Sequence, residues 1–223
     1  MIKEDKQIMN ETIPYTNVIT GTLDVISQSL TIPVLIILLL MVVVIAIIGG
    51  MVISEYTSLK KVPIEVINEL IFNINGSETV DELEHVIMKS ELPKTQKEIL
   101  IQIAFSGELS EVSREAMARK LVENEEEKFD SRLQKTDIIT RIGPTLGLMG
   151  TLIPMGPGLA ALGSGDITTL AQSLTVAFDT TIVGIGTGAL AYVISKLRRK
   201  WYEHYISDLD ALTDALLDKM REM

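Results

Sequence analysis

Polar side chains inside otherwise apolar stretches are the residues of this 223-residue chain that could do chemistry. Thr151 and Thr181 each place a hydroxyl in such a stretch, and Asp179 places a carboxyl group there. Hydroxyl oxygens are uncharged, so they can pass a proton or another cation along without trapping it. A carboxylate inside a membrane costs about 2.5–3.5 kcal/mol or more, which makes Asp179 a candidate functional residue. Thr145 and Thr180 add two further hydroxyls to this candidate ion pathway.

An alternative role for Asp179 is a structural hydrogen bond to a Thr or to a freed carbonyl of a neighbouring helix. Positions 179 and 181 are about 200° apart around a helix, so their side chains cannot both point at one pore axis. If Thr181 faces a water-filled channel, we expect Asp179 to face a helix interface or the other flank of a partner.

Composition removes several classes of site. The chain has no cysteine, which excludes disulfides, thiol catalysis and cysteine-ligated metals. Its two histidines, His85 and His204, have no second ligand at metal spacing, and no Ser–His or Ser–Lys pairing lies in the apolar stretches. The formal net charge is -10 and no basic face is present, so nucleic acid is not expected as a partner. We therefore predict no enzymatic activity, no catalytic residue, no cofactor and no metal site.

Three stretches are long and apolar enough to cross a membrane. Residues 32–53 form a run of 22 residues without a charge, and at about 1.5 Å per residue the run covers about 33 Å, enough for a hydrocarbon core. The other two stretches are richer in Gly, Pro and Thr, which is typical of helices that pack on helices or line a water-filled path. The predicted segments are an extracytoplasmic N-terminal segment (1–31), transmembrane helix 1 (32–53), an acidic helical cytoplasmic domain (54–140), transmembrane helix 2 (141–162), a short external hairpin (163–168), transmembrane helix 3 (169–195) and a cytoplasmic amphipathic C-terminal helix (196–223).

Lys and Arg near the ends of the spans indicate the orientation, because these residues collect on the cytoplasmic side. Lys60 and Lys61 follow the first span, Lys135 and Arg141 precede the second, and four cations follow the third within 196–200. The short hairpin has none. We therefore predict a multi-pass protein of the cell membrane, with its N-terminus outside and its C-terminus in the cytoplasm.

The region predicted to lie in the cytoplasm is typical of helices. Residues 54–140 include 18 acidic and 11 basic residues, and Thr79 and Glu82 have the spacing of a capping box. From about Ser110 to Thr140 no Gly or Pro interrupts the chain, which predicts one long helix that continues into the second span.

The C-terminal segment carries an apolar stripe at helical spacing, and two explanations for it stay open. The stripe can pack against the cytoplasmic helices or neighbouring subunits. It can also lie on the lipid surface, which its acidic polar face disfavours because inner leaflets are anionic. The stripe consists of Leu197, Trp201, Tyr205, Leu209, Leu212, Leu216 and Met220.

The second and third spans are joined by so short a loop that they must form a hairpin. Counted from its middle, at position 165.5, Thr151 lies 14.5 residues before the turn and Thr181 lies 15.5 residues after it. Both hydroxyls are then about 22–23 Å from the turn, so antiparallel helices bring them to the same depth. Small residues recur at spacings of three and four, which predicts close helix packing, either alone or beside a polar path. They include Gly143, Gly147, Gly150, Gly184 and Gly188.

The sequence GPTLGLMGTL at 143–152, with LAQSL at 170–174 and the stretch 177–184, resembles the MotA/TolQ/ExbB proton-channel family. The order of three spans, the outside N-terminus and the large cytoplasmic insertion are similar to the ExbB/TolQ branch. This resemblance implies an all-α membrane protein, a homopentamer whose second and third spans line a central pore. It also implies a partner, a single-span ExbD/TolR/MotB-like protein whose membrane helix carries an essential aspartate.

By the same resemblance, Thr151 and Thr181 correspond to the pore threonines of the family. The ExbB/TolQ branch has a glutamate about five residues before the second threonine, and this chain has Val176 there. Its acidic residue is instead Asp179, two residues before that threonine. The role of the family's glutamate therefore does not transfer directly.

Together these observations predict a pore-forming stator subunit of a motor driven by the proton-motive force. The subunit would conduct ions with its single-span partner in the lipid bilayer and convert the flow into mechanical work. Two alternatives are a membrane scaffold that conducts nothing and a small secondary transporter, although three spans without a repeat are few for alternating access.

Overall fold

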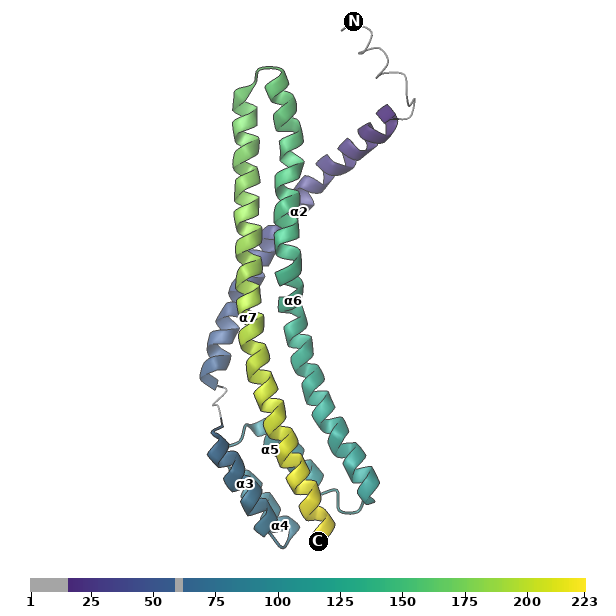
Figure 1. Cartoon of the computed structure of the whole chain (residues 1–223), viewed down its shortest axis with the longest axis vertical. Coiled ribbons are helices and arrows are strands. Elements are labelled where there is room, and N and C mark those ends of the chain that lie inside the picture. The colour runs from purple at the N-terminus through teal and green to yellow at the C-terminus, as the bar shows by residue number, and fades with distance from the viewer. Residues whose placement is uncertain (1–15, 59–61) are drawn as a thin grey trace, which may run out of the picture. The chain divides into compact units, whose positions relative to one another are not determined.

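A computed structural model describes residues 16–58 and 62–223 of the chain, and within these residues every regular element is a helix (Figure 1). This confirms the all-α prediction for the described part. The first half of the predicted segment 1–31, as well as Lys60 and Lys61, lies outside the described residues. The helices are α2 (Thr16–Ser58), α3 (Ile64–Gly76), α4 (Val80–Lys89), α5 (Lys94–Ala104), α6 (Glu111–Gly163) and α7 (Ile167–Glu222).

Three of these helices are long and apolar enough to cross a membrane, as the sequence predicts. They are α2, within Val18–Glu55, and the full lengths of α6 and α7. Helix α2 begins at Thr16, well before the apolar run 32–53, so the second half of the predicted N-terminal segment is helical. Helix α6 joins the predicted long helix and the second span without a break, although it contains three prolines.

The chain divides into two compact units, which are described separately here. The hairpin unit comprises Met1–Ala46 and Ile139–Leu190, and the acidic unit comprises Ile47–Ile138 and Ala191–Met223. Helices α2, α6 and α7 each contribute residues to both units.

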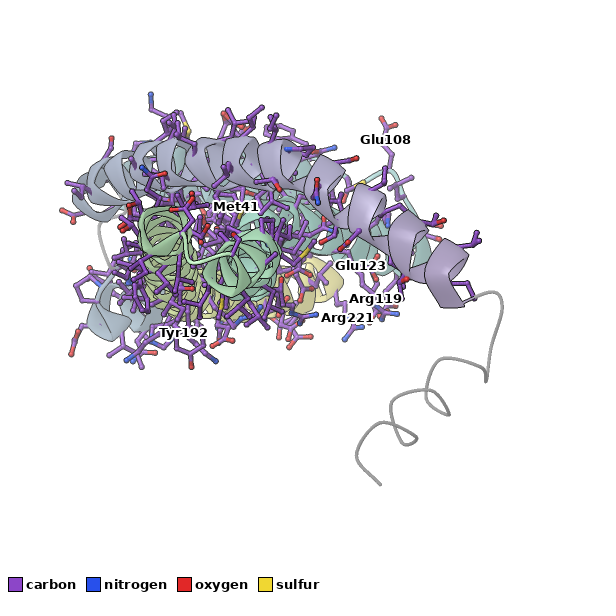
Figure 2. All side chains as sticks on the ribbon, turned by 90° about the horizontal axis from the view of Figure 1, so that it is seen from above. Met41, Glu108, Arg119, Glu123, Tyr192 and Arg221 are labelled. Atoms are coloured by element: carbon purple, nitrogen blue, oxygen red, sulfur yellow. The ribbon has the colours of Figure 1, made fainter. Side chains whose placement is uncertain are left out.

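In the hairpin unit, the C-terminal part of α6 and the N-terminal part of α7 run antiparallel and are joined by a short loop (Figure 1). Helix α2 buries one face there, formed by Val34, Leu38, Met41 and Ile45 at spacings of three and four. In Figure 2, Met41 lies on the side of α2 that faces the hairpin. Ile48 and Val52, further along α2, are also buried, whereas most of its other apolar side chains are exposed, which suits a helix whose remaining faces contact lipid.

The loop between α6 and α7 is held by two local features. Gly165 has a φ of +83°, a left-handed conformation that glycine adopts without strain. Asp166 caps the start of α7, because its carboxylate accepts hydrogen bonds from the backbone N–H of Thr169 (3.1 Å) and from the Thr169 hydroxyl (2.5 Å). These hydrogen bonds lower the pKa of Asp166 below its usual value.

The acidic unit has a hydrophobic core built by α3, α4, α5 and parts of α6 and α7. Leu209, Leu212, Leu216 and Met220 of the C-terminal stripe are buried in this core. Of the two explanations for that stripe, packing against the other helices is therefore confirmed for these four residues. Leu197, at the other end of the stripe, is 45% exposed and lies outside this core.

The predicted capping box is present at the start of α4. The Thr79 hydroxyl accepts a hydrogen bond from the backbone N–H of Glu82 at 3.3 Å. The Glu82 carboxylate accepts one from the N–H of Glu78 at 2.8 Å, so it reaches one residue further back than the standard motif.

Replacing Thr79 with Ala is expected to lower the free energy of unfolding of α4 by about 1 kcal/mol, because one N-terminal N–H loses its acceptor. Hydrogen exchange of the α4 amides, followed by mass spectrometry in detergent, measures this. Thr79→Ser retains a hydroxyl and should exchange like the wild type. Equal exchange in Thr79→Ala would show that the cap contributes nothing.

Candidate functional site

The candidate site lies on the α6–α7 hairpin, and its register follows from contacts between small residues. A Cβ atom built on Gly150 would lie 2.6 Å from Cβ of Thr180, and one built on Gly143 would lie 3.2 Å from the backbone nitrogen of Gly188. The Gly143–Gly188 pair is centred between residues 165 and 166, and the Gly150–Thr180 pair is centred on residue 165, within half a residue of the predicted middle of the loop. The helices run antiparallel, so Thr151 lies one residue nearer the loop than Gly150, and Thr181 lies one residue further from the loop than Thr180. At about 1.5 Å per residue, the two hydroxyl residues therefore lie within about 3 Å of the same level.

Close approach of the two backbones depends on Gly184. A Cβ atom on this residue would lie 2.6 Å from the carbonyl oxygen of Gly143 and 2.6 Å from Cα of Gly147. Both are backbone atoms, which cannot move aside as the end of a side chain can. At Gly188 a Cβ atom would lie 2.7 Å from Cδ of Pro144. The five glycines singled out in the sequence thus all lie at the contact between α6 and α7.

The four candidate threonines differ in exposure. Thr180 is buried, with 6% of its surface exposed, and lies against Gly150. Thr151 and Thr181 are half-buried, whereas Thr145 is exposed. The hairpin therefore places Thr180 in the helix contact and leaves Thr151 and Thr181 at its edge.

Each of these hydroxyls donates its hydrogen to a carbonyl oxygen of its own helix. Thr151 donates to Leu148 at 2.6 Å, and Thr181 donates to Ala177 at 3.2 Å. Thr145 and Thr180 make equivalent bonds within their own helices. A hydroxyl oxygen that donates its hydrogen keeps two lone pairs, so it can still accept a hydrogen bond or coordinate a cation.

Asp179 is exposed in the single chain, on another side of α7 from the buried Thr180. Within the described residues, no hydrogen bond or ion pair joins its carboxylate to another side chain or to the backbone of a neighbouring helix. Val176, at the position of the family's glutamate, is 38% exposed. The exposed carboxylate of Asp179 is therefore open to a group outside this chain.

The acidic unit contains an ionic cluster that the sequence analysis missed. Glu55 accepts a hydrogen bond from Nε of Arg198 at 3.0 Å and one from the Tyr202 hydroxyl at 2.7 Å. Arg132 lies 3.6 Å from the same carboxylate. Arg198 has only 8% of its side chain exposed, so its charge is neutralised by Glu55 in a largely buried setting. The sequence feature that could have indicated this cluster is Glu55, an isolated acidic residue directly after an apolar run. Its partner Arg198 lies 143 positions away, so spacing along the chain does not connect the two.

A second polar contact joins α6 to α7 in the acidic unit. Ser195 donates a hydrogen bond to the Asp137 carboxylate, and Arg199 lies 3.2 Å from the same group. Arg198 and Arg199, which the sequence analysis used only for orientation, thus each pair with a carboxylate of another helix. Within the described part of the chain, no three His, Asp or Glu residues cluster closely enough to hold a metal ion.

Burial raises the pKa of Tyr202 to about 12, and the hydrogen bond to Glu55 and its negative charge act in the same direction. Tyr202 lies beyond the predicted span 169–195. The folded protein therefore binds more protons than the unfolded chain between about pH 10 and pH 12, so this stabilisation is complete below pH 10 and is lost as the pH rises towards 12.

We expect the thermal midpoint of the wild type to fall more steeply than that of Tyr202→Phe across this pH window. Scanning calorimetry of the detergent-solubilised chain between pH 9 and about 11.5 measures the difference. Parallel pH profiles of the two proteins would contradict the assignment of the shifted pKa to Tyr202.

Comparison with known proteins identifies the group to which this arrangement belongs. The model of the MotA/TolQ/ExbB proton channel family matches residues 80–211, more than half of the chain. The matched region covers α4, α5, all of α6 and α7 as far as Ala211, so it includes both helices of the hairpin. No individual curated protein matches the chain. The three membrane-length helices and this match make the chain a multi-pass membrane protein that belongs to the MotA/TolQ/ExbB proton channel family.

Proposed function

We propose that this chain is the pore-forming subunit of an ion-driven motor, coupled to the proton-motive force, and that it acts as the stator. The observation that carries the proposal is the register of the α6–α7 hairpin, in which Thr151 and Thr181 lie within about 3 Å of one level, beside a close glycine contact. In a family of proton channels, two hydroxyls at one depth are suited to pass a cation between them.

The subunit is proposed to assemble as a homopentamer in which α6 and α7 line a central pore. Large apolar side chains on the exposed faces of both helices support this, because they need lipid, a neighbouring copy or a partner helix to cover them. Phe178 is 65% exposed, Ile182 70% and Leu152 62%. The proposed partner is a single-span ExbD/TolR/MotB-like protein that places its membrane aspartate inside the ring. Ion flow past that aspartate would drive mechanical work, and the chain itself would not be an enzyme.

Within the ring, Thr151 and Thr181 are proposed to carry the ion pathway, with Thr145 nearer one end. Thr180, which packs on Gly150, would hold the hairpin at this level. Asp179 is exposed on another side of α7 from the buried Thr180. We propose that it faces a neighbouring copy or the flank of the partner helix. The glycines at the helix contact would keep the hydroxyls of one hairpin in register.

The chain is proposed to have three spans, as in the ExbB/TolQ branch, and to lie in the cell membrane. The distribution of Lys and Arg supports an outside N-terminus and a cytoplasmic C-terminus. In this orientation the part of the acidic unit outside the predicted spans lies in the cytoplasm, where α3, α4, α5 and parts of α6 and α7 form the core described above.

Mass measurement tests the assembly. The complex is purified in detergent, with and without a co-expressed single-span protein that carries a membrane aspartate, and weighed by native mass spectrometry. We expect a ring of five times the 24.6 kDa of one chain and additional mass when the partner is present. A monomer would overturn the proposal, and a ring that binds no such partner would favour a non-conducting scaffold.

Asp179→Asn is expected to lower ion flux several-fold while the mass of the ring stays the same. Asn keeps the size of Asp but cannot carry its charge or take up a proton. The flux is measured as dye-reported proton uptake into liposomes that contain the ring and its partner. Asp130→Asn, the same change at an exposed position of α6, serves as the control. Wild-type flux in Asp179→Asn would assign Asp179 a purely structural role.

A further inference from the structure

Within the acidic unit, the exposed side of α7 at residues 192–200 carries aromatic, apolar and cationic side chains. Val193 and Leu197 are 54% and 45% exposed, and Tyr192 is 52% exposed at the outer edge of the helices in Figure 2. Lys196 and Lys200 follow Tyr192 at spacings of four and are both exposed. These three residues therefore share one side of the helix, and Val193 and Leu197 lie on the adjacent side.

The two lysines differ from the arginines between them. Arg198 is paired with Glu55 and Arg199 with Asp137, so both arginine charges are neutralised inside the acidic unit. In the described part of the chain, neither Lys196 nor Lys200 has a carboxylate partner. Nζ of Lys196 lies 5.8 Å from the centre of the Tyr192 ring, within the range of a cation–π interaction, which favours a conformation beside the aromatic side chain.

We propose that Tyr192, Lys196 and Lys200 bind the phosphate headgroup of an anionic phospholipid. The combination of side chains fits such a lipid, because exposed Val193 and Leu197 beside this face can contact acyl chains while the two ammonium groups meet the phosphate. Aromatic rings at the level of the headgroups are typical of helices that leave a membrane. A soluble phosphate compound has no acyl chains, so it would leave the apolar part of this face uncovered. The proposal rests on membrane insertion of the chain and does not depend on ion conduction.

Lipid retention by the purified full-length complex tests the site. Phosphatidylglycerol and, separately, phosphatidylcholine are titrated into the delipidated complex, and bound lipid is counted by native mass spectrometry. We expect phosphatidylglycerol to bind in preference to phosphatidylcholine, and its binding to weaken as NaCl is added. The double variant Lys196→Gln/Lys200→Gln should bind it about thirtyfold more weakly, because each lysine near an anionic surface contributes about fivefold.

Two control variants isolate the site from net charge and from folding. Lys89→Gln/Lys94→Gln removes the same charge from exposed positions of α4 and α5 and should bind phosphatidylglycerol like the wild type. Lys196→Arg/Lys200→Arg keeps both charges and should also retain the lipid. The proposal is overturned if phosphatidylcholine binds equally well, if both Gln variants lose the lipid equally, or if neither does. Displacement of the lipid from the wild type by inorganic phosphate alone would instead indicate a site for a soluble anion. Ion flux does not enter these measurements, so their failure leaves the proposed conduction intact.

Discussion

Thr181→Val is expected to lower ion flux about tenfold without changing the assembly, which corresponds to a barrier higher by about 1.4 kcal/mol. Valine has nearly the shape of threonine but lacks the oxygen that would accept a hydrogen bond or bind a cation. Thr181 is half-buried, and its hydroxyl bonds only to Ala177 of its own helix. Removing this hydroxyl therefore leaves no partner side chain unsatisfied, so the fold should tolerate the change.

The flux is measured as proton uptake into liposomes driven by a potassium diffusion potential, with the single-span partner present. Thr175→Val is the matched control, because Thr175 also lies on α7 and also donates to a carbonyl of its own helix, that of Ala171 at 3.0 Å. We expect flux close to the wild type in this control. Unchanged flux in both Thr181→Val and Asp179→Asn would favour a non-conducting scaffold over a channel.

Gly184→Ala is expected to destabilise the hairpin by about 1–3 kcal/mol, the usual cost of overpacking a tight contact. The added methyl group would lie 2.6 Å from two backbone atoms of α6, the oxygen of Gly143 and Cα of Gly147. The helices must then separate or shift along each other. Separation would increase the distance between Thr181 and Thr151, and a shift along the helix axes would change their relative level.

Gly186→Ala provides the matched control on the same helix. Apart from its chain neighbours and the backbone of its own helix, no atom lies within 4 Å of a Cβ built on Gly186, so the methyl group meets no other helix of the chain. Because alanine favours the helix over glycine, the control should be neutral or slightly more stable. The thermal midpoint of the purified complex in detergent distinguishes the two variants. Equal midpoints would contradict the close backbone contact at Gly184.

Local and periodic features of the fold were predictable from the sequence. The capping box at Thr79 follows from residue spacing, and the continuity of α6 follows from the lack of Gly and Pro in its first half. The register of the hairpin follows from simple counting, because a short loop leaves two antiparallel helices little freedom to slide. The beginning of α2 was not predicted, since Thr16 precedes any apolar run and the helix continues through polar residues.

The ionic contacts of Glu55 could not be predicted from the sequence, because they depend on tertiary packing. Glu55 meets Arg198 and Tyr202 only because tertiary packing brings distant helix turns together. Among the candidate hydroxyls, sequence spacing set the level of Thr151 and Thr181 but not which threonine lies in the helix contact. That place belongs to Thr180, because Gly150 opposite it leaves room for its side chain. In the proposed assembly, the groups that face Asp179 would belong to other chains.

The glycine contact between α6 and α7 also limits how such a channel can widen. Where the backbones of α6 and α7 touch directly, no side chain can change its rotamer to make room. Each hairpin should therefore move as a rigid body. In the proposed ring, any widening of the pore would then have to occur at the interfaces between neighbouring copies. A cross-link between neighbouring copies should therefore prevent changes in pore width, whereas a cross-link between α6 and α7 of one copy should still allow them.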